Sequence, residues 1–226
     1  MAWAFLQPLL TMFIFTVFFL EFAKIPSDGV LYPLFVRAAL LPWTLFAEGL
    51  TRSTTSMVTN ANIMTKVYFP RLIMPLSSII SPLVDFAVSF IILIAIMIYY
   101  GFMPTVNIVF LPVGLLLALA TALGVGLWLS ALNVKYRDFQ YTVPFKIQIL
   151  LFASPVVYAS SLVPESLRVW YGLNPMAGVI KGFRWALLGI GAPSAMVLVS
   201  VGMVIVLLVS GMLYFRRMEQ YYADIV

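Results

Sequence analysis

The sequence contains neither cysteine nor histidine among its 226 residues. These absences exclude disulfides, thiolate nucleophiles, most zinc sites and the imidazole that usually acts as a general base near neutral pH. Asp and Glu together number only 8 and are scattered along the chain, which does not favour a carboxylate metal cluster. We therefore expect no catalytic residues, no metal site and no enzymatic role.

Charge is scarce as well, and apolar side chains dominate. Charged residues make up 9% of the chain and hydrophobic residues 63%, with a mean hydropathy of +1.08. A soluble domain needs a polar shell that this composition cannot supply. The sequence therefore predicts an all-α integral membrane protein. The formal charge of +5 fits Lys and Arg beside anionic headgroups and does not require nucleic acid.

Six apolar stretches approach the roughly 20 residues that a helix needs to cross a bilayer. They predict six transmembrane helices within a single domain, 1–226, at about 3–22, 31–50, 72–100, 108–132, 143–163 and 194–215. The N-terminus lacks the basic region of a signal peptide, so we expect the first stretch to be retained.

Basic residues are distributed unevenly between the two sets of loops. The links after the second and fourth stretches and the C-terminal tail carry most of them, namely Arg52, Lys66, Arg71, Lys135, Arg137, Arg216 and Arg217. Since positively charged loops stay in the cytoplasm, both termini are predicted to be cytoplasmic.

A short helix is predicted at about 61–70, on the cytoplasmic side. Asn60 can cap it and Pro70 ends it. It presents an apolar and aromatic group beside two cations, comprising Ile63, Met64, Val67, Tyr68 and Phe69 with Lys66 and Arg71. This pattern fits a contact with a soluble partner or a linker anchored at the headgroups. The turn Tyr136, Arg137 and Asp138, taken alone, indicates an ordinary cytoplasmic loop.

The segment at about 164–188 is too interrupted for two crossings and too apolar for a free loop. Pro164, Gly172, Pro175, Gly178 and Gly182 are expected to break it into short helices. Such helices persist at membrane depth only when protein or a water-filled cavity covers them. We predict a re-entrant pair of outer helices that closes a pathway, carrying Trp170, Tyr171, Phe183 and Trp185. An aromatic belt at the interface is the alternative.

Three further features within the spans suggest structural roles. Asp85 is expected to have a partner, for which Arg37 is a candidate, and Glu48 and Arg52 have the spacing of a helical salt bridge. Small residues recur at every fourth position, at Gly114, Ala118, Ala122, Gly126 and Ser130. Such a stripe lets another helix approach closely, within the subunit or across a dimer.

Several blocks of the sequence are similar to one protein family across essentially the whole chain. They are L-Q-P-L-L-T-M (6–12), I-P-S-D-G-V-x-Y-P-L-F-V (25–36), L-L-P-W-T (40–44), N-A-N-I-M-T-K-V-Y-F-P-R (60–71), S-A-L-N-V-K-Y-R-D (130–138), A-S-P-V-V-Y (153–158) and L-N-P-M-A-G-V-I-K-G-F-R-W-A-L-L-G (173–189). The chain resembles the permease subunit of bacterial ABC-type polysaccharide exporters. In members of this family a further amphipathic segment usually precedes the W-A-x-L-Q-P block. In this sequence Met1 lies almost at the start of that block.

The resemblance implies a homodimer in the bacterial inner membrane, joined to two nucleotide-binding subunits that hold ATP and Mg²⁺. It implies that 61–70 contains the coupling helix, that Tyr136–Asp138 forms a second contact with the ATPase, and that 164–188 forms periplasmic gate helices. The implied cargo is a polysaccharide on undecaprenyl diphosphate. This chain has no G-x-x-x-x-G-K-[ST] motif, in agreement with ATP hydrolysis on another chain.

The implied pathway runs at the dimer interface, between the first and fifth spans. Candidates for an aromatic surface along it are Phe15, Phe18, Phe19 and Phe22 on the first span, with Phe152 and Tyr158 on the fifth. A permease for another cargo, such as a drug, a lipid or teichoic acid, shares the same fold class. A membrane enzyme of lipid-linked glycan synthesis would need convergent carboxylates or histidine, and a passive channel would need rings of polar residues.

Overall fold

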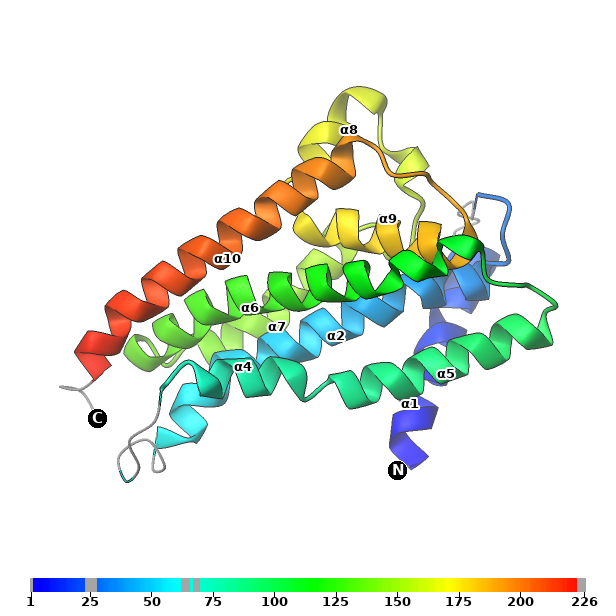
Figure 1. Ribbon diagram of the computed structural model, residues 1–226. Coiled ribbons are helices and arrows are strands. Elements are labelled where there is room, and N and C mark those ends of the chain that lie inside the picture. The colour runs from blue at the N-terminus through cyan, green and yellow to red at the C-terminus, as the bar shows by residue number, and fades with distance from the viewer. Residues whose placement is uncertain (1, 23–27, 62–65, 67–69, 223–226) are drawn as a thin grey trace.

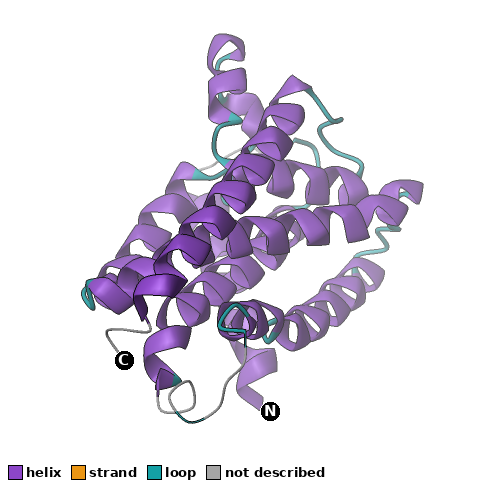
Figure 2. Ribbon diagram, turned by 60° about the vertical axis from the view of Figure 1, so that its left-hand side comes forward, coloured by secondary structure: helices purple, strands orange, loops and turns teal. Residues whose placement is uncertain are grey.

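The computed structural model describes residues 2–22, 28–61, 66 and 70–222, and every regular element in these ranges is a helix (Figure 2). In chain order these are α1 (Ala2–Thr16), η1 (Val17–Phe22), α2 (Tyr32–Thr59), α4 (Ile73–Ile80), α5 (Leu83–Tyr99), η2 (Val106–Phe110), α6 (Leu111–Lys135), α7 (Phe139–Ala153), η3 (Ser160–Leu162), α8 (Glu165–Tyr171), α9 (Pro175–Leu188) and α10 (Ala195–Tyr222).

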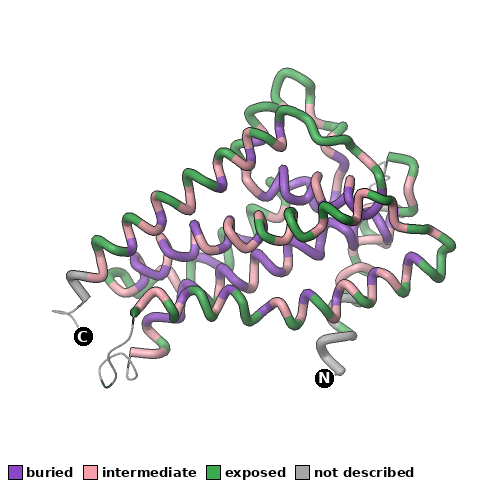
Figure 3. Tube along the Cα trace, viewed as in Figure 1, coloured by how far each residue is buried: buried purple, intermediate pink, exposed green. Residues whose placement is uncertain are grey.

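Helix α2 forms the centre of the bundle and is buried along most of its length (Figure 3). It packs against α6, α4, α9, α5, α7 and α1, so six of the described helices surround it. Pro33 stands in its first turn, where a missing N–H costs nothing. Burial on all sides explains why this helix carries the weakest hydrophobic signal of the candidate spans, since protein rather than lipid surrounds it.

Four helical stretches are long and apolar enough to cross a membrane: Tyr32–Thr59, Ile73–Tyr99, Val106–Lys135 and Ala195–Glu219. The third predicted span is interrupted at Ser81 and Pro82. The fifth, predicted at 143–163, is an α-helix only to Ala153, and the rest is irregular backbone apart from the short 3-10 turn η3. Helices α1 and α7 are each 15 residues long, which is shorter than the roughly 20 residues that span a bilayer. That the chain crosses the membrane six times therefore stays a prediction.

Two helices, α8 and α9, occupy the segment at about 164–188. Pro164 precedes α8 and Gly172 follows it, whereas the Asn174 side chain accepts the Met176 N–H at 3.1 Å and starts α9. Gly178 and Gly182 do not break α9, contrary to expectation. The absent side chain of Gly178 instead admits Ser200 of α10 against the helix. Where this pair lies relative to a membrane stays a prediction.

The small-residue stripe of α6 packs within the subunit, as the first of its two interpretations predicted. A Cβ on Gly126 would lie 2.7 Å from Oγ of Ser53, and one on Gly114 would lie 2.9 Å from the Phe183 ring. A second close crossing, between Gly124 of α6 and Gly211 of α10, has no counterpart in the sequence-based expectations. Small residues on α6 therefore serve two faces of one helix.

Figure 1 places the C-terminal ends of α2 and α10 and the α6–α7 turn at one end of the bundle. Arg71, which precedes α4, donates a hydrogen bond of 2.9 Å to the Glu219 carbonyl of α10 at this end. We call it the inner end, and the end that holds α8 the outer end. The basic residues Lys135, Arg137 and Arg216 lie toward the inner end.

Candidate functional site: the uncovered face of α7

Helix α7 contributes little to the core of the described subunit. Only Val143 and Ile147 are buried among its residues. Its uncovered face carries Tyr141, Phe145 and Phe152, whose exposed fractions are 75%, 64% and 59%. Thr142, Lys146 and Gln148 are exposed between these aromatic residues.

The exposed positions of α10 have a different composition. From the start of the helix to residue 215 they are all aliphatic or glycine: Ala195, Leu198, Gly202, Ile205, Val206, Val209 and Leu213. Lipid tails accept such a surface, whereas ionisable side chains in spans usually face protein or water. The face of α7 is therefore suited to a polar-aromatic ligand or to a water-filled path.

The inner end of α7 is fixed by one buried amide. Asn133, at the end of α6, donates from Nδ2 to the Thr54 carbonyl at 3.0 Å. Its Oδ1 accepts the Gln140 N–H at 3.1 Å, in the first turn of α7. Asn133 is fully buried, so both bonds are sheltered from water and hold α7 to α2 and α6.

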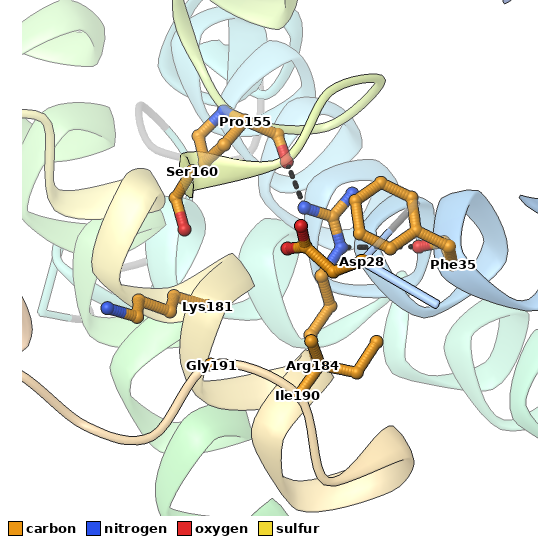
Figure 4. A pocket seen from close by; sticks show the side chains of 8 residues that line it. All are labelled: Asp28, Phe35, Pro155, Ser160, Lys181, Arg184, Ile190 and Gly191. Atoms are coloured by element: carbon orange, nitrogen blue, oxygen red, sulfur yellow. Dashed lines mark hydrogen bonds between the residues drawn. The ribbon is translucent and has the colours of Figure 1, made fainter. Parts of the chain in front are cut away.

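The outer end of α7 is fixed by Arg184 of α9. Its guanidinium donates to the carbonyls of Pro155 and Val156, each at 2.7 Å, and to that of Tyr158 at 3.1 Å. Nε donates to the Phe35 carbonyl of α2 at 3.3 Å, and the guanidinium lies 3.5 Å from the centroid of the Phe35 ring (Figure 4). These bonds satisfy the carbonyls of backbone that is not helical, so the chain can leave α7 while staying buried.

Two further side chains hold the last carbonyl of α7. Tyr171 of α8 donates to the Ala153 carbonyl at 2.8 Å, and Asn174 donates to the same oxygen at 3.3 Å. The Tyr171 hydroxyl also contacts the hydroxyl of Tyr158. Burial, with the Tyr158 hydrogen bond, raises the pKa of Tyr171, so its hydroxyl keeps its proton at neutral pH.

A small pocket lies beside Arg184 and is lined by charged residues, Asp28 and Lys181, together with apolar ones such as Phe35 and Ile190 (Figure 4). Asp28 accepts a hydrogen bond from Ser161 at 2.9 Å, and Lys181 donates to Ser194 at 2.8 Å. Each charged group here already has a protein partner. We therefore interpret the pocket as part of the contacts that fix the outer end of α7.

The predicted aromatic residues separate into exposed and buried groups. Phe152 and Trp170 are exposed, Tyr158 and Tyr171 are partly buried, and Trp185 packs on Phe110 with ring centroids 5.3 Å apart. The structure corrects the expectation that Phe183 lies at the outer interface, because this residue is fully buried in the core and lies edge-on to Phe86. Its ring fills the space left by Gly114, so it offers no exposed surface.

The phenylalanines of the first span do not share one face. Phe15 and Phe19 stack with ring centroids 5.7 Å apart and pack against the core, whereas Phe18 is 59% exposed. The helix changes from α to π winding at Val17, so the 3.6-residue register does not extend past Thr16. The side chain of Phe22 lies outside the described residues.

The predicted ATPase contacts are described only in part. Lys66, Tyr136, Arg137 and Asp138 are exposed, as a contact surface requires, and Arg71 binds α10. The apolar part of the predicted coupling helix, Ile63, Met64, Val67, Tyr68 and Phe69, lies outside the described residues.

Asp85 has a charged partner, as expected, but that partner is Arg52 and not the candidate Arg37. Asp85 lies 3.6 Å from Arg52, which also forms the predicted salt bridge with Glu48 at 3.1 Å. Arg37 is buried instead against α5, where it donates a long hydrogen bond of 3.4 Å to the Ser89 carbonyl. One turn along α5 thus separates the carboxylate from the arginine proposed for it.

Sequence reasoning missed Tyr141, Phe145, Lys146 and Gln148 of α7, and Phe13 of α1, which is 63% exposed. Tyr141 fell outside the predicted span, which began at 143. Lys146 was detectable, since a lysine inside an apolar stretch is itself a sign of function.

Comparisons with known proteins agree with this architecture. Residues 1–188 match the family described as ABC-2 type transporter. A Myxococcus xanthus protein named "O-antigen export system permease protein RfbA" is 30% identical over 224 residues, which cover 96% of this chain and 85% of that protein. A Klebsiella pneumoniae protein of the same name is 29% identical over 183 residues, covering 80% of this chain and 70% of the relative. Both relatives are named as permeases, which are transport subunits rather than enzymes. The chain is thus a multi-pass membrane protein that belongs to the ABC-2 type transporter family.

Proposed function

We propose that this chain is the membrane subunit of an ATP-driven exporter of undecaprenyl-diphosphate-linked polysaccharide of the O-antigen type. The observation that carries the proposal is the uncovered face of α7, in a chain whose relatives are named as O-antigen export permeases. That face combines aromatic rings with amide and hydroxyl groups, whereas the exposed face of α10 is aliphatic.

A sugar chain suits the face of α7 for a simple chemical reason. Its C–H groups pack on flat aromatic rings, and its hydroxyls exchange hydrogen bonds with side chains such as Gln148 and Thr142. A translocated polymer must also leave each contact, so a row of weak contacts serves it better than one tight pocket. Phe145 and Phe152, two turns apart on α7, have the spacing of such a row.

The pathway is proposed to run between two copies of the chain. Both α1 and α7 expose large apolar and aromatic side chains, including Phe13 and Phe145, that a single subunit leaves uncovered. A homodimer with these helices facing each other would line a channel with them, and α8 and α9 would serve as its periplasmic gate. The six crossings, the inner-membrane location and the cytoplasmic termini belong to this proposal.

An ABC-2 permease of an export system implies an ATPase partner, which we place at the inner end. The coupling segment at about 61–70 would enter each of two ATPase subunits, and the exposed turn Tyr136–Asp138 would add a second contact. Arg71 would then connect the coupling segment to α10 through the Glu219 carbonyl.

The test is purification of this chain with a co-expressed ATPase subunit, reconstituted in lipid nanodiscs. ATP hydrolysis is measured with undecaprenyl-diphosphate-linked glycan and, as the control, with the same glycan lacking the lipid. We expect a complex of two permease and two ATPase subunits whose hydrolysis rises with the lipid-linked glycan. A complex that responds only to another lipid or to a drug would contradict the cargo, and a chain that binds no ATPase would contradict the whole proposal.

A further inference from the structure

Lys146 is the one described cation within the uncovered face of α7. It stands two turns into the helix, about 10 Å from Phe139 at 1.5 Å per residue. Its Nζ lies 5.6 Å from the centroid of the Phe139 ring. The ammonium therefore folds back toward the inner end of the bundle.

No described carboxylate forms an ion pair with Lys146. The ion pairs among the described residues join Arg52 to Glu48 and Asp85, and Arg168 to Glu165. A cation in a membrane-spanning region needs a counter-charge, a polar lining or water, because hydrocarbon solvates it poorly. The Phe139 ring supplies only a weak partner, so an anion bound to Lys146 would have to come from outside the described residues.

The residues around Lys146 indicate what carries that anion. Toward the outer end, α7 also exposes Gln148 and Phe152, which lie further around the helix from Lys146 and form the surface suited to a sugar chain. Lys146 and Phe152 are separated by about 9 Å along the helix axis. A glycan attached to a lipid through phosphate presents this order of groups, with the anion next to the first sugars.

We propose that Lys146 binds the phosphate of a lipid-linked glycan as it enters the pathway, an inference that rests on the proposed function. The ammonium acts as a point charge for the phosphate oxygens, and the aromatic and amide groups beyond it receive the first sugars. Lys146 thereby selects cargo by its phosphate junction, whereas the rest of the face tolerates different sugars.

The experiment uses the reconstituted complex and undecaprenyl diphosphate as the probe, in nanodiscs of phosphatidylcholine with or without phosphatidylglycerol. The concentration that half-maximally stimulates ATP hydrolysis is measured for Lys146→Gln, for Lys146→Arg and for Arg216→Gln. Arg216 is an exposed cation at the inner end of α10 and serves as the matched control. Undecaprenol, which lacks phosphate, is the matched control ligand.

We expect Lys146→Gln to raise the half-maximal concentration about tenfold, the cost of one charge-assisted hydrogen bond. Lys146→Arg restores it, Arg216→Gln leaves it unchanged, and undecaprenol is equally weak for every variant. A wild-type response that Lys146→Gln leaves intact overturns this inference alone. So does an equal loss in Lys146→Gln and Arg216→Gln that appears only with phosphatidylglycerol, since that result assigns Lys146 to lipid headgroups. A wild-type complex without any response to undecaprenyl diphosphate overturns the proposed cargo together with this inference.

Discussion

Helices α7 and α10 lie in the same subunit and are attached to it in opposite ways. Helix α7 is fixed at its two ends by polar side chains, Asn133 at the inner end and Arg184 at the outer end, and exposes its middle. Helix α10 is packed along its length on α6 and α9 through Gly211 and Ser200. Anchorage at the ends leaves a face of α7 available to a moving ligand, whereas α10 has one face packed on protein and one exposed aliphatic face that suits lipid.

The anchor at the outer end can be broken with the largest expected effect. Arg184→Met leaves the carbonyls of Pro155, Val156 and Tyr158 without donors, at roughly 1–3 kcal/mol for each buried group. We expect the apparent Tm in detergent to fall on the order of 10 °C. Arg37→Met is the control, since Arg37 is equally buried but its Nε has no hydrogen-bond partner among the described residues. Equal losses in the two variants would show that burial, and not the carbonyl anchorage, sets the effect.

A lysine introduced on the exposed face of α7 or of α10 tests whether one face meets water or a ligand and the other meets lipid. Ile205→Lys on α10 should cost about 2.5–3.5 kcal/mol in lipid and reduce the amount of chain recovered from membranes. Ile149→Lys on α7 replaces a residue of similar exposure, 53% against 57%, and should be tolerated. Membrane fractionation and size-exclusion chromatography measure both, and loss of both variants alike would mean that the α7 face also meets lipid.

Packing along α10 can be disturbed without altering charge. A Cβ at Gly211 would collide with the Gly124 carbonyl of α6, so Gly211→Ala should destabilise the protein by about 1–3 kcal/mol. Gly202→Ala on the same helix has no neighbouring atom within 4 Å and should be neutral or slightly stabilising. Thermal unfolding in detergent compares the two variants. A Gly211→Ala variant as stable as the unchanged protein would contradict the close crossing of α10 with α6.

The smallest expected effect on stability is also a functional test. Phe152→Ala removes an exposed ring of α7 and should change stability by less than about 0.5 kcal/mol. Loss of about 1 kcal/mol of aromatic contact should slow glycan export roughly fivefold. Val209→Ala on α10 should leave the export rate unchanged. The initial rate of surface glycan appearance measures both, and a wild-type rate in Phe152→Ala would leave the α7 face without a role in transport.

Local signals in the sequence predicted the elements better than the site. The start of α9 could be foreseen because Asn174 and Pro175 act within one turn, and Gly189, with a φ of 73°, ends it in the left-handed conformation. The salt bridge of Glu48 with Arg52 is equally local. These features depend on neighbours in the chain, which the sequence displays.

The remaining features depend on residues far apart in the chain. Arg184 reaches a carbonyl 149 positions away, and Phe183 is buried because Gly114 of another helix leaves room for its ring. An apolar pattern cannot separate a face that meets lipid from one that meets a ligand, so Phe145 and Tyr141 gave no signal. Lys146 and Gln148 did interrupt that pattern, and they are the residues from which the face of α7 could have been foreseen.

The most direct test of the different surroundings uses the absence of cysteine from the chain, which makes any introduced cysteine the only labelling site. Gln148→Cys and Phe152→Cys on α7 are compared with Val206→Cys and Val209→Cys on α10, in native membranes, using a water-soluble maleimide. We expect the α7 positions to be labelled and the α10 positions to be protected, with lipid-linked glycan slowing the labelling of α7. Protection of all four positions would contradict a water-accessible face on α7 and, with it, the pathway proposed here.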